Sequence, residues 1–221
     1  MHNTHDLFIQ YANNEIVSKT FGFTEQLLKI HQIEQRNGKP KIARVDTDKP
    51  DGTAIVYYHI VDQTFYLAIY IDTIPEPMVR AVTTEPYHSV YLRADSETLS
   101  LSELGKLSVL PATGGRNIGE KKSKTSETAT WKASTIFFEP NTEADEFEDK
   151  LEKLLSFLEG DKAGVNRLVI EAGAYVQVFS SFHNGNTMLG GHHINKDLLK
   201  RMAKLNLAID FDISVEGISY T

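Results

Sequence analysis

The sequence TEADEFEDKLEKLLSFLEG, residues 142–160, predicts an amphipathic helix that must pack against another element. Acidic side chains crowd its first turns, where the positive end of a helix dipole favours negative charge. Asn141 and Thr142 are N-cap residue types, and Gly160 is a C-cap type. The apolar side is formed by Phe147, Leu151, Leu154, Leu155 and Leu158. Because only one side of this helix is apolar, we expect a sheet to cover it.

Outward from this helix, predicted strands alternate with further one-sided helices. The apolar spacing predicts helices over residues 100–107 and 195–205, the second capped by Asn195. Strands are expected at residues 130–138, 167–182 and 207–215. Gly173, inside the longest of these strands, predicts a bulge or bend. We therefore expect an α+β fold: a mostly antiparallel sheet with helices packed on one face, plus an N-terminal helix and β-hairpin extension.

The first part of the chain, residues 1–87, is expected to form that extension beside an α+β sandwich domain at residues 88–221. Apolar residues at helical spacing predict a helix over residues 13–35. Two runs of β-branched and aromatic residues with a short polar link predict a hairpin, and two short strands and a long polar loop follow. These segments are residues 53–60 and 64–72 for the hairpin, 78–83 and 89–94 for the strands, and 111–128 for the loop.

Composition limits the classes of function. The chain has 221 residues, of which 41% are hydrophobic, a net charge of −7 and no cysteine. The excess of acidic residues argues against nucleic-acid binding, and the lack of cysteine excludes disulfides, thiol catalysis and cysteine-ligated metals. No apolar run is long enough to span a membrane, and the N-terminus lacks the basic-then-apolar order of a signal peptide. A cytoplasmic protein without membrane contact is expected.

Six segments carry a resemblance to a known family. They are residues 90–95 (VYLRAD), 100–104 (SLSEL), 119–122 (GEKK), 130–134 (TWKAS), 147–151 (FEDKL) and 198–213. With the order of elements around them, they resemble the bacterial domain-of-unknown-function family 4279 over about residues 88–215. The resemblance implies a small cytoplasmic domain, in some members in settings that suggest toxin immunity. It supplies no catalytic residues to transfer.

Three histidines within eleven residues are candidate metal ligands. Neutral imidazole binds zinc, nickel or copper, and His183, His192 and His193 lie close together in sequence. Adjacent histidines rarely face the same way, however, and no carboxylate lies at close sequence spacing. A polar turn before the helix that Asn195 caps explains the same residues.

A glycine-rich loop is a second candidate site. Backbone amides of residues 114–119 (GGRNIG) could hold an anion, with charge from Arg116 and Lys121. The spacing matches neither a Walker motif nor a dinucleotide fingerprint, and the loop precedes a strand rather than a helix. Trp131, at the start of that strand, would line the pocket. A solvent-exposed loop and a core tryptophan are the alternative interpretation.

Two groups of acidic residues are candidates for binding a basic partner. Asp210 and Asp212 alternate with apolar residues, so both should project from one face of the last strand. The other group, on the acidic helix, comprises Glu146, Glu148 and Asp149. An acidic surface attracts and orients a basic protein, although such charges commonly belong to an ordinary solvated face.

These features lead to two hypotheses. The first is a non-enzymatic, cofactor-free protein-binding domain, immunity-like or antitoxin-like, that neutralises a basic partner. It fits the lack of a Gly-x-Ser-x-Gly or His-Glu-x-x-His motif. The alternative is a small-ligand or metal-binding module in which the glycine-rich loop, Trp131 and the histidine-containing turn share one pocket.

Overall fold

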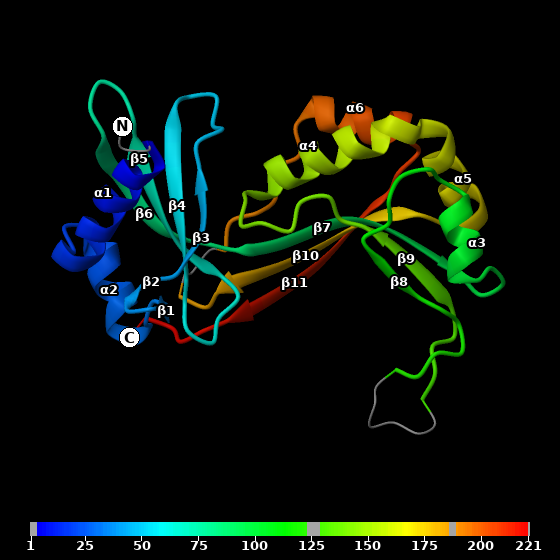
Figure 1. Ribbon diagram of the computed structural model, residues 1–221, viewed down its shortest axis with the longest axis horizontal. Coiled ribbons are helices and arrows are strands. Elements are labelled where there is room, and N and C mark those ends of the chain that lie inside the picture. Colours follow the sequence, from blue (N-terminus) through cyan, green and yellow to red (C-terminus); the bar gives the residue numbers. More distant parts are fainter. Residues whose placement is uncertain (1–3, 123–128, 186–188, 221) are drawn as a thin grey trace.

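The computed structural model describes residues 4–122, 129–185 and 189–220 and contains two main β-sheets (Figure 1). The elements of the first part are α1 (Thr4–Ser18), α2 (Gly22–Ile30), β1 (Gln35–Arg36), β2 (Lys39–Pro40), β3 (Ile42–Asp46), β4 (Thr53–His59), β5 (Tyr66–Asp72) and β6 (Met78–Glu85). Those of the second part are β7 (Tyr87–Ser96), α3 (Leu101–Lys106), β8 (Gly114–Arg116), β9 (Ser134–Phe138), α4 (Phe147–Leu158), the 3-10 helix η1 (Glu159–Asp161), α5 (Lys162–Ala172), β10 (Tyr175–His183), α6 (Lys196–Lys204) and β11 (Ile209–Glu216).

The N-terminal sheet is antiparallel, in the order β3-β4-β5-β6. The predicted hairpin is confirmed as β4 and β5, in which Tyr57 lies opposite Ala68. The helix predicted over residues 13–35 is two helices, because a turn with Lys19 at φ 50° separates them. The buried Glu15 carboxylate holds this turn by accepting hydrogen bonds from the Phe21 N–H (3.1 Å) and the Thr24 hydroxyl (2.6 Å).

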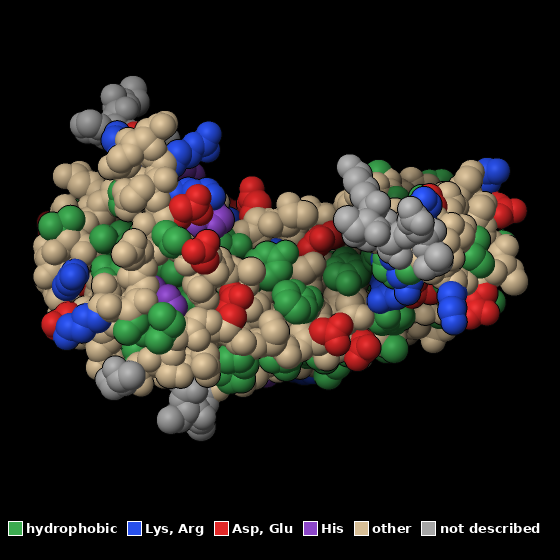
Figure 2. Space-filling view, turned by 90° about the horizontal axis from the view of Figure 1, so that it is seen from below, with side chains coloured by type: hydrophobic (Ala, Val, Ile, Leu, Met, Phe, Trp, Pro, Cys, Tyr) green, Lys and Arg blue, Asp and Glu red, His purple; other side chains and the backbone are tan. Residues whose placement is uncertain are grey.

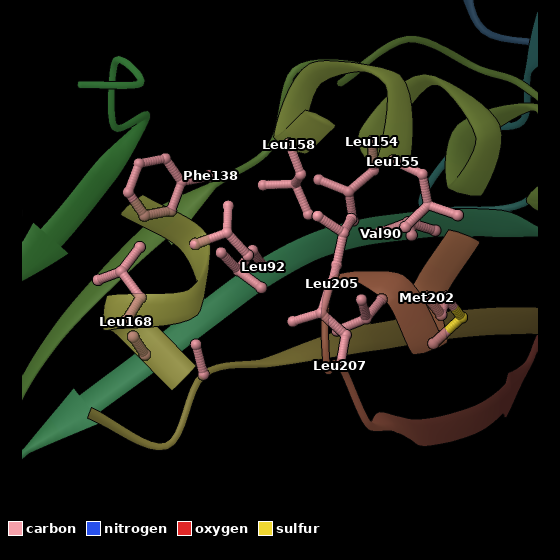
Figure 3. Packing of buried hydrophobic residues seen from close by; sticks show 14 of the residues in the cluster. Val90, Leu92, Phe138, Leu154, Leu155, Leu158, Leu168, Met202, Leu205 and Leu207 are labelled. Carbon is pink, nitrogen blue, oxygen red and sulfur yellow. The ribbon is translucent and has the colours of Figure 1, made fainter. Parts of the chain in front are cut away.

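The second sheet has the order β11-β10-β7-β9-β8, and helices pack on one face of it (Figure 1). Only the β10–β11 pairing is parallel, so the predicted α+β class with a mostly antiparallel sheet is confirmed. Alternate residues of β7, such as Val90 and Leu92, enter the core between the sheet and the helices. Figure 3 shows Leu155 and Leu158 of α4 above Val90 and Leu92, and Met202 of α6 belongs to the same core cluster.

The strand predicted over residues 167–182 is partly wrong. Its first part belongs to α5, which buries Val165, Leu168 and Ala172 along one side. Gly173, at φ 57°, adopts the left-handed conformation that ends the helix, so it is a C-cap and not a bulge. Other boundaries shift as well. The helix predicted from residue 142 begins at Phe147, and the strand predicted from residue 130 begins at Ser134. Within the predicted loop at 111–128, residues 114–116 form β8, and residues 123–128 lie outside the described residues.

The two sheets meet at Pro86, between β6 and β7. The face of the N-terminal sheet that points away from α1 and α2 buries Ile55, Tyr57 and Tyr66 in a cluster with Ala144 and Tyr87 from the second part of the chain. The N-terminal sheet is therefore packed against the segment before α4. None of the described helices has the length and apolar character needed to span a membrane.

Candidate functional site

The face of the second sheet opposite its helices carries aromatic and acidic side chains, and we call it the open face. Figure 2 shows hydrophobic and acidic side chains side by side on this lower side of the molecule. Ring pairs bridge neighbouring strands, with centroids 5.6 Å apart for Tyr91 and Phe137 and 6.2 Å apart for Tyr87 and Phe179. Such rings are half-buried, which leaves apolar surface available for contact.

Asp210 and Asp212 project from β11 on the open face, as the alternation predicted. Ile209 and Phe211 pack toward the helix side of the sheet, and both aspartates are exposed. The Asp212 carboxylate accepts a hydrogen bond of 3.3 Å from the Gln177 side chain. Among the described residues, no cation lies within salt-bridge distance of either aspartate.

Arg116 and Trp131, both singled out from the sequence, are brought together. The Arg116 guanidinium carbon lies 3.7 Å from the centroid of the Trp131 ring and 5.7 Å from that of Phe137. The second cation at the tryptophan is Lys122, with Nζ 4.9 Å from the ring centroid, whereas Lys121 forms a backbone bridge to Thr130. These contacts join residues 116–122, at and after the end of β8, to residues 130 and 131, before β9.

The acidic residues of α4 point to a different place from Asp210 and Asp212. Glu146 and Asp149 both bind the Lys49 ammonium, which lies 2.5 Å from Glu146 Oε2. The Glu148 carboxylate accepts a hydrogen bond of 3.1 Å from the backbone N–H of His193. Because α4 lies on the helix side of the sheet, the five predicted partner-binding acids do not form one surface.

A buried network of ion pairs joins the N-terminal sheet to the start of α4. Arg44 reaches Asp145 (2.7 Å) and Asp46 (3.1 Å), and Lys153 also reaches Asp145 (2.6 Å). Burial alone would raise the pKa of Asp145, but hydrogen bonds from Lys153 and Arg44 lower it below its usual value. Asp46, Asp145 and Asp149 form the one group of three potential metal ligands among the described residues. Since cations of the chain already neutralise these carboxylates, we assign the network a structural role.

The three candidate metal-binding histidines do not come together. His183 Nε2 lies 3.0 Å from His31 Nε2 and 3.1 Å from the Ile218 carbonyl oxygen. His192 Nε2 lies 3.1 Å from the Ser180 hydroxyl, and the exposed His193 contacts Glu148 through its backbone. Their different partners exclude a shared three-histidine site.

The glycine-rich loop and the histidine-containing turn also lie apart. Strands β9 and β10 both run antiparallel to β7, so they run in the same direction. Residues 117–122 and 129–133 come before the start of β9, and residues 184–185 and 189–193 follow the end of β10. The two segments therefore lie at opposite ends of the sheet, and the expected shared pocket is not formed.

Sequence reasoning missed several residues that cluster at the junction of the two sheets. Glu85 ends β6 and accepts a hydrogen bond of 3.1 Å from the Tyr70 hydroxyl. Burial, with a smaller effect of the charge on Glu146, raises the pKa of Glu85 to about 8. His88 Nδ1 lies 2.8 Å from the Ser180 hydroxyl, and burial lowers the pKa of His88 to about 3. The segment 84–88 resembled an ordinary strand connection, so it carried no signal of this cluster.

The fold and these surfaces define an α+β protein with one sheet face covered by helices and the other open. The family described as "Domain of unknown function (DUF4279)" matches residues 85–216, more than half of the chain. The chain belongs to this family, as its sequence segments suggested. Searches among curated proteins and among solved structures found no match.

Proposed function

We propose that the chain is a non-enzymatic protein-binding domain that binds a basic partner protein on its open face. The main support is the combination, on one sheet face, of half-buried aromatic rings with the exposed Asp210 and Asp212, which form no ion pair with any described residue. Aromatic residues are enriched at the centres of protein interfaces, where they supply contact area with little loss of side-chain entropy. Carboxylates around them favour a positively charged partner and increase its rate of association.

The charge balance of the open face supports a basic partner. Arg93 is paired with Asp95 at 2.7 Å, and Arg116 is stacked on Trp131. Asp210 and Asp212 keep their charge unpaired by any cation among the described residues. The acids of α4 are less suited to this role, because Glu146 and Asp149 already bind Lys49.

We infer an immunity-like or antitoxin-like role in the cytoplasm, in which the domain neutralises a basic effector. Two arguments support this role: the charge complementarity that neutralisation requires, and the settings that the family resemblance implies. The chain's net charge of −7 adds a long-range attraction for a basic protein, and salt would weaken that attraction.

Reversing the two charges on β11 tests the proposal. The partner for this test is a basic protein that is captured in stoichiometric amount from host lysate at low salt and then purified. The double variant Asp210→Lys/Asp212→Lys should bind this protein about 100-fold more weakly. The reason is that two attractive contacts become repulsive. Titration calorimetry at low and high salt measures the loss, which should shrink as salt increases.

The matched control reverses two exposed acids on the helix side of the sheet, Glu152→Lys in α4 and Glu171→Lys in α5, and changes the net charge equally. This control should lose less than about threefold in affinity, because distant exposed charges are largely screened. If both double variants lost the same affinity, net charge alone would explain the effect. That result would contradict an interface on the open face.

A further inference from the structure

A cavity of about 200 Å³ lies where β6 meets β7 and α4 begins, on the opposite side of the sheet from the open face. We call it the junction cavity. Its wall combines three carboxyl groups with four rings, and glycines 190 and 191 complete the rim. The carboxyl groups belong to Glu85, Glu146 and Glu148, and the rings to His88, Phe147, Phe182 and His192.

The carboxyl groups of this wall have too few cations. The Tyr70 hydroxyl lies 3.1 Å from Glu85 Oε2 and 3.4 Å from Glu146 Oε1, and its single proton can serve only one of them. Lys49 binds Glu146 and Asp149, whereas Glu85 has no ion-pair partner among the described residues. The raised pKa of Glu85 reflects this deficit, since burial and the charge of Glu146 both disfavour its ionised form. Glu85 therefore keeps its proton at pH 7, and an incoming cation would favour the release of that proton.

The rings of the wall are neutral and tightly placed. His88 is 4% exposed, and its Nδ1 is held by Ser180. For His88 Nε2 the structure gives no hydrogen-bond partner among the described residues. The low pKa of His88, about 3, keeps this ring neutral at physiological pH. The ring centroids of Phe147 and His192 are 4.4 Å apart, so the apolar side of the cavity is aromatic. Aromatic faces attract cations and also contact alkyl chains.

We propose that the junction cavity binds an organic cation, a primary ammonium or guanidinium group on a short alkyl stem. The carboxylates of Glu146 and Glu148, joined by Glu85 once it has released its proton, match the charged head, and the rings match the stem. The volume is below the roughly 300–1,000 Å³ of pockets for drug-sized ligands, so it suits a small amine or the end of a lysine or arginine side chain. The charged carboxylates of Glu146 and Glu148 repel anions, which disfavours phosphates and carboxylates as ligands.

The test is a titration of protein labelled with 13C-histidine, with the ring signals of His88 and His192 as the readout. We expect n-butylammonium and n-propylguanidinium to shift both signals saturably with a Kd of about 1 mM, because such small ions have few atoms to contribute. The neutral analogue n-butanol should bind at least about tenfold more weakly. Two sources of the cation are possible, a free small amine and a lysine side chain of a polypeptide. Nα-acetyl-lysine methylamide, which keeps its Nε ammonium group, distinguishes them. If this lysine derivative binds as tightly as n-butylammonium, the cavity accepts a polypeptide side chain. If n-butylammonium binds and the lysine derivative does not, the cavity accepts only a free amine.

A variant that cannot ionise connects the binding to the Glu85 carboxyl group. Glu85→Gln keeps an acceptor for the Tyr70 hydroxyl and should weaken n-butylammonium binding about tenfold. The control Glu97→Gln, at an exposed position outside the cavity, should leave binding unchanged. The proposal is overturned if neither cation gives a saturable shift, if n-butanol binds equally well, or if Glu85→Gln has no effect. These results do not depend on the basic partner of the open face, since the probes are small ions and Asp210 and Asp212 remain intact.

Discussion

Asp145→Ala should lower the free energy of unfolding by about 3 kcal/mol, because it removes the shared anion of a buried ion-pair network. The Asp145 side chain is fully buried and lies 2.7 Å from Arg44 and 2.6 Å from Lys153. Arg44 is itself only 10% exposed, and the variant would leave this desolvated charge with Asp46, at 3.1 Å, as its remaining buried partner. Urea unfolding followed by circular dichroism measures the change as a lower midpoint.

The neighbouring acid Glu143 provides the control for this variant. It lies 3.6 Å from Arg44, but its side chain is 69% exposed. Exposed pairs contribute little, so Glu143→Ala should change stability by less than about 1 kcal/mol. If the two variants had the same midpoint, the buried network would not be what joins the N-terminal sheet to α4.

The parts of the fold that sequence predicted correctly are those whose signal is local. The β4–β5 hairpin has two β-branched and aromatic runs separated by a short polar link. The helix after Asn195 has a side-chain cap, which accepts hydrogen bonds from the N–H groups of Asp197 and Leu198. Helix α5 was missed because Leu168, Val169 and Ile170 form a continuous apolar run. Such a run is ambiguous between a strand and a helix that packs on a sheet.

The site was predictable only where one strand or one loop determines the geometry. Alternation along β11 was enough to place Asp210 and Asp212 on one face. The pairs that define the other clusters are far apart in sequence: 152 residues separate His31 from His183, and 92 separate His88 from Ser180. No spacing rule relates such residues, because the sheet order that brings them together depends on packing of the whole chain.

The buried histidines should each lower the stability of the protein as the pH falls from 7 to 5. Burial lowers the pKa of His88 to about 3, and it also lowers the pKa of His31 and His183. Below pH 6.5 the unfolded chain takes up protons that the folded chain does not, so the free energy of unfolding falls with pH. His88 alone should contribute a loss of about 2 kcal/mol at pH 5, from about 1.4 kcal/mol per pH unit. Urea midpoints of the wild type and of His88→Gln, compared from pH 7 to pH 5, measure this contribution.

The other buried groups determine how this pH dependence must be tested. The raised pKa of Glu85, about 8, acts with the opposite sign, because the folded chain then holds a proton that the unfolded chain releases above pH 4.5. Between pH 7 and pH 5 its contribution, about 1.4 kcal/mol per pH unit, is as large as that of His88, so the pH dependence of the wild type alone does not report on the histidines. Carboxyl groups with lowered pKa, such as Asp145, titrate below this range. His88→Gln removes one histidine, keeps a hydrogen-bonding group for Ser180 and leaves Glu85 in place. Below pH 6.5 it should therefore reduce the slope of the unfolding free energy against pH by nearly the amount for one proton, about 1.4 kcal/mol per pH unit. An unchanged slope would mean that His88 titrates at its ordinary pKa in the folded protein, and that its buried contact with Ser180 does not keep the ring neutral.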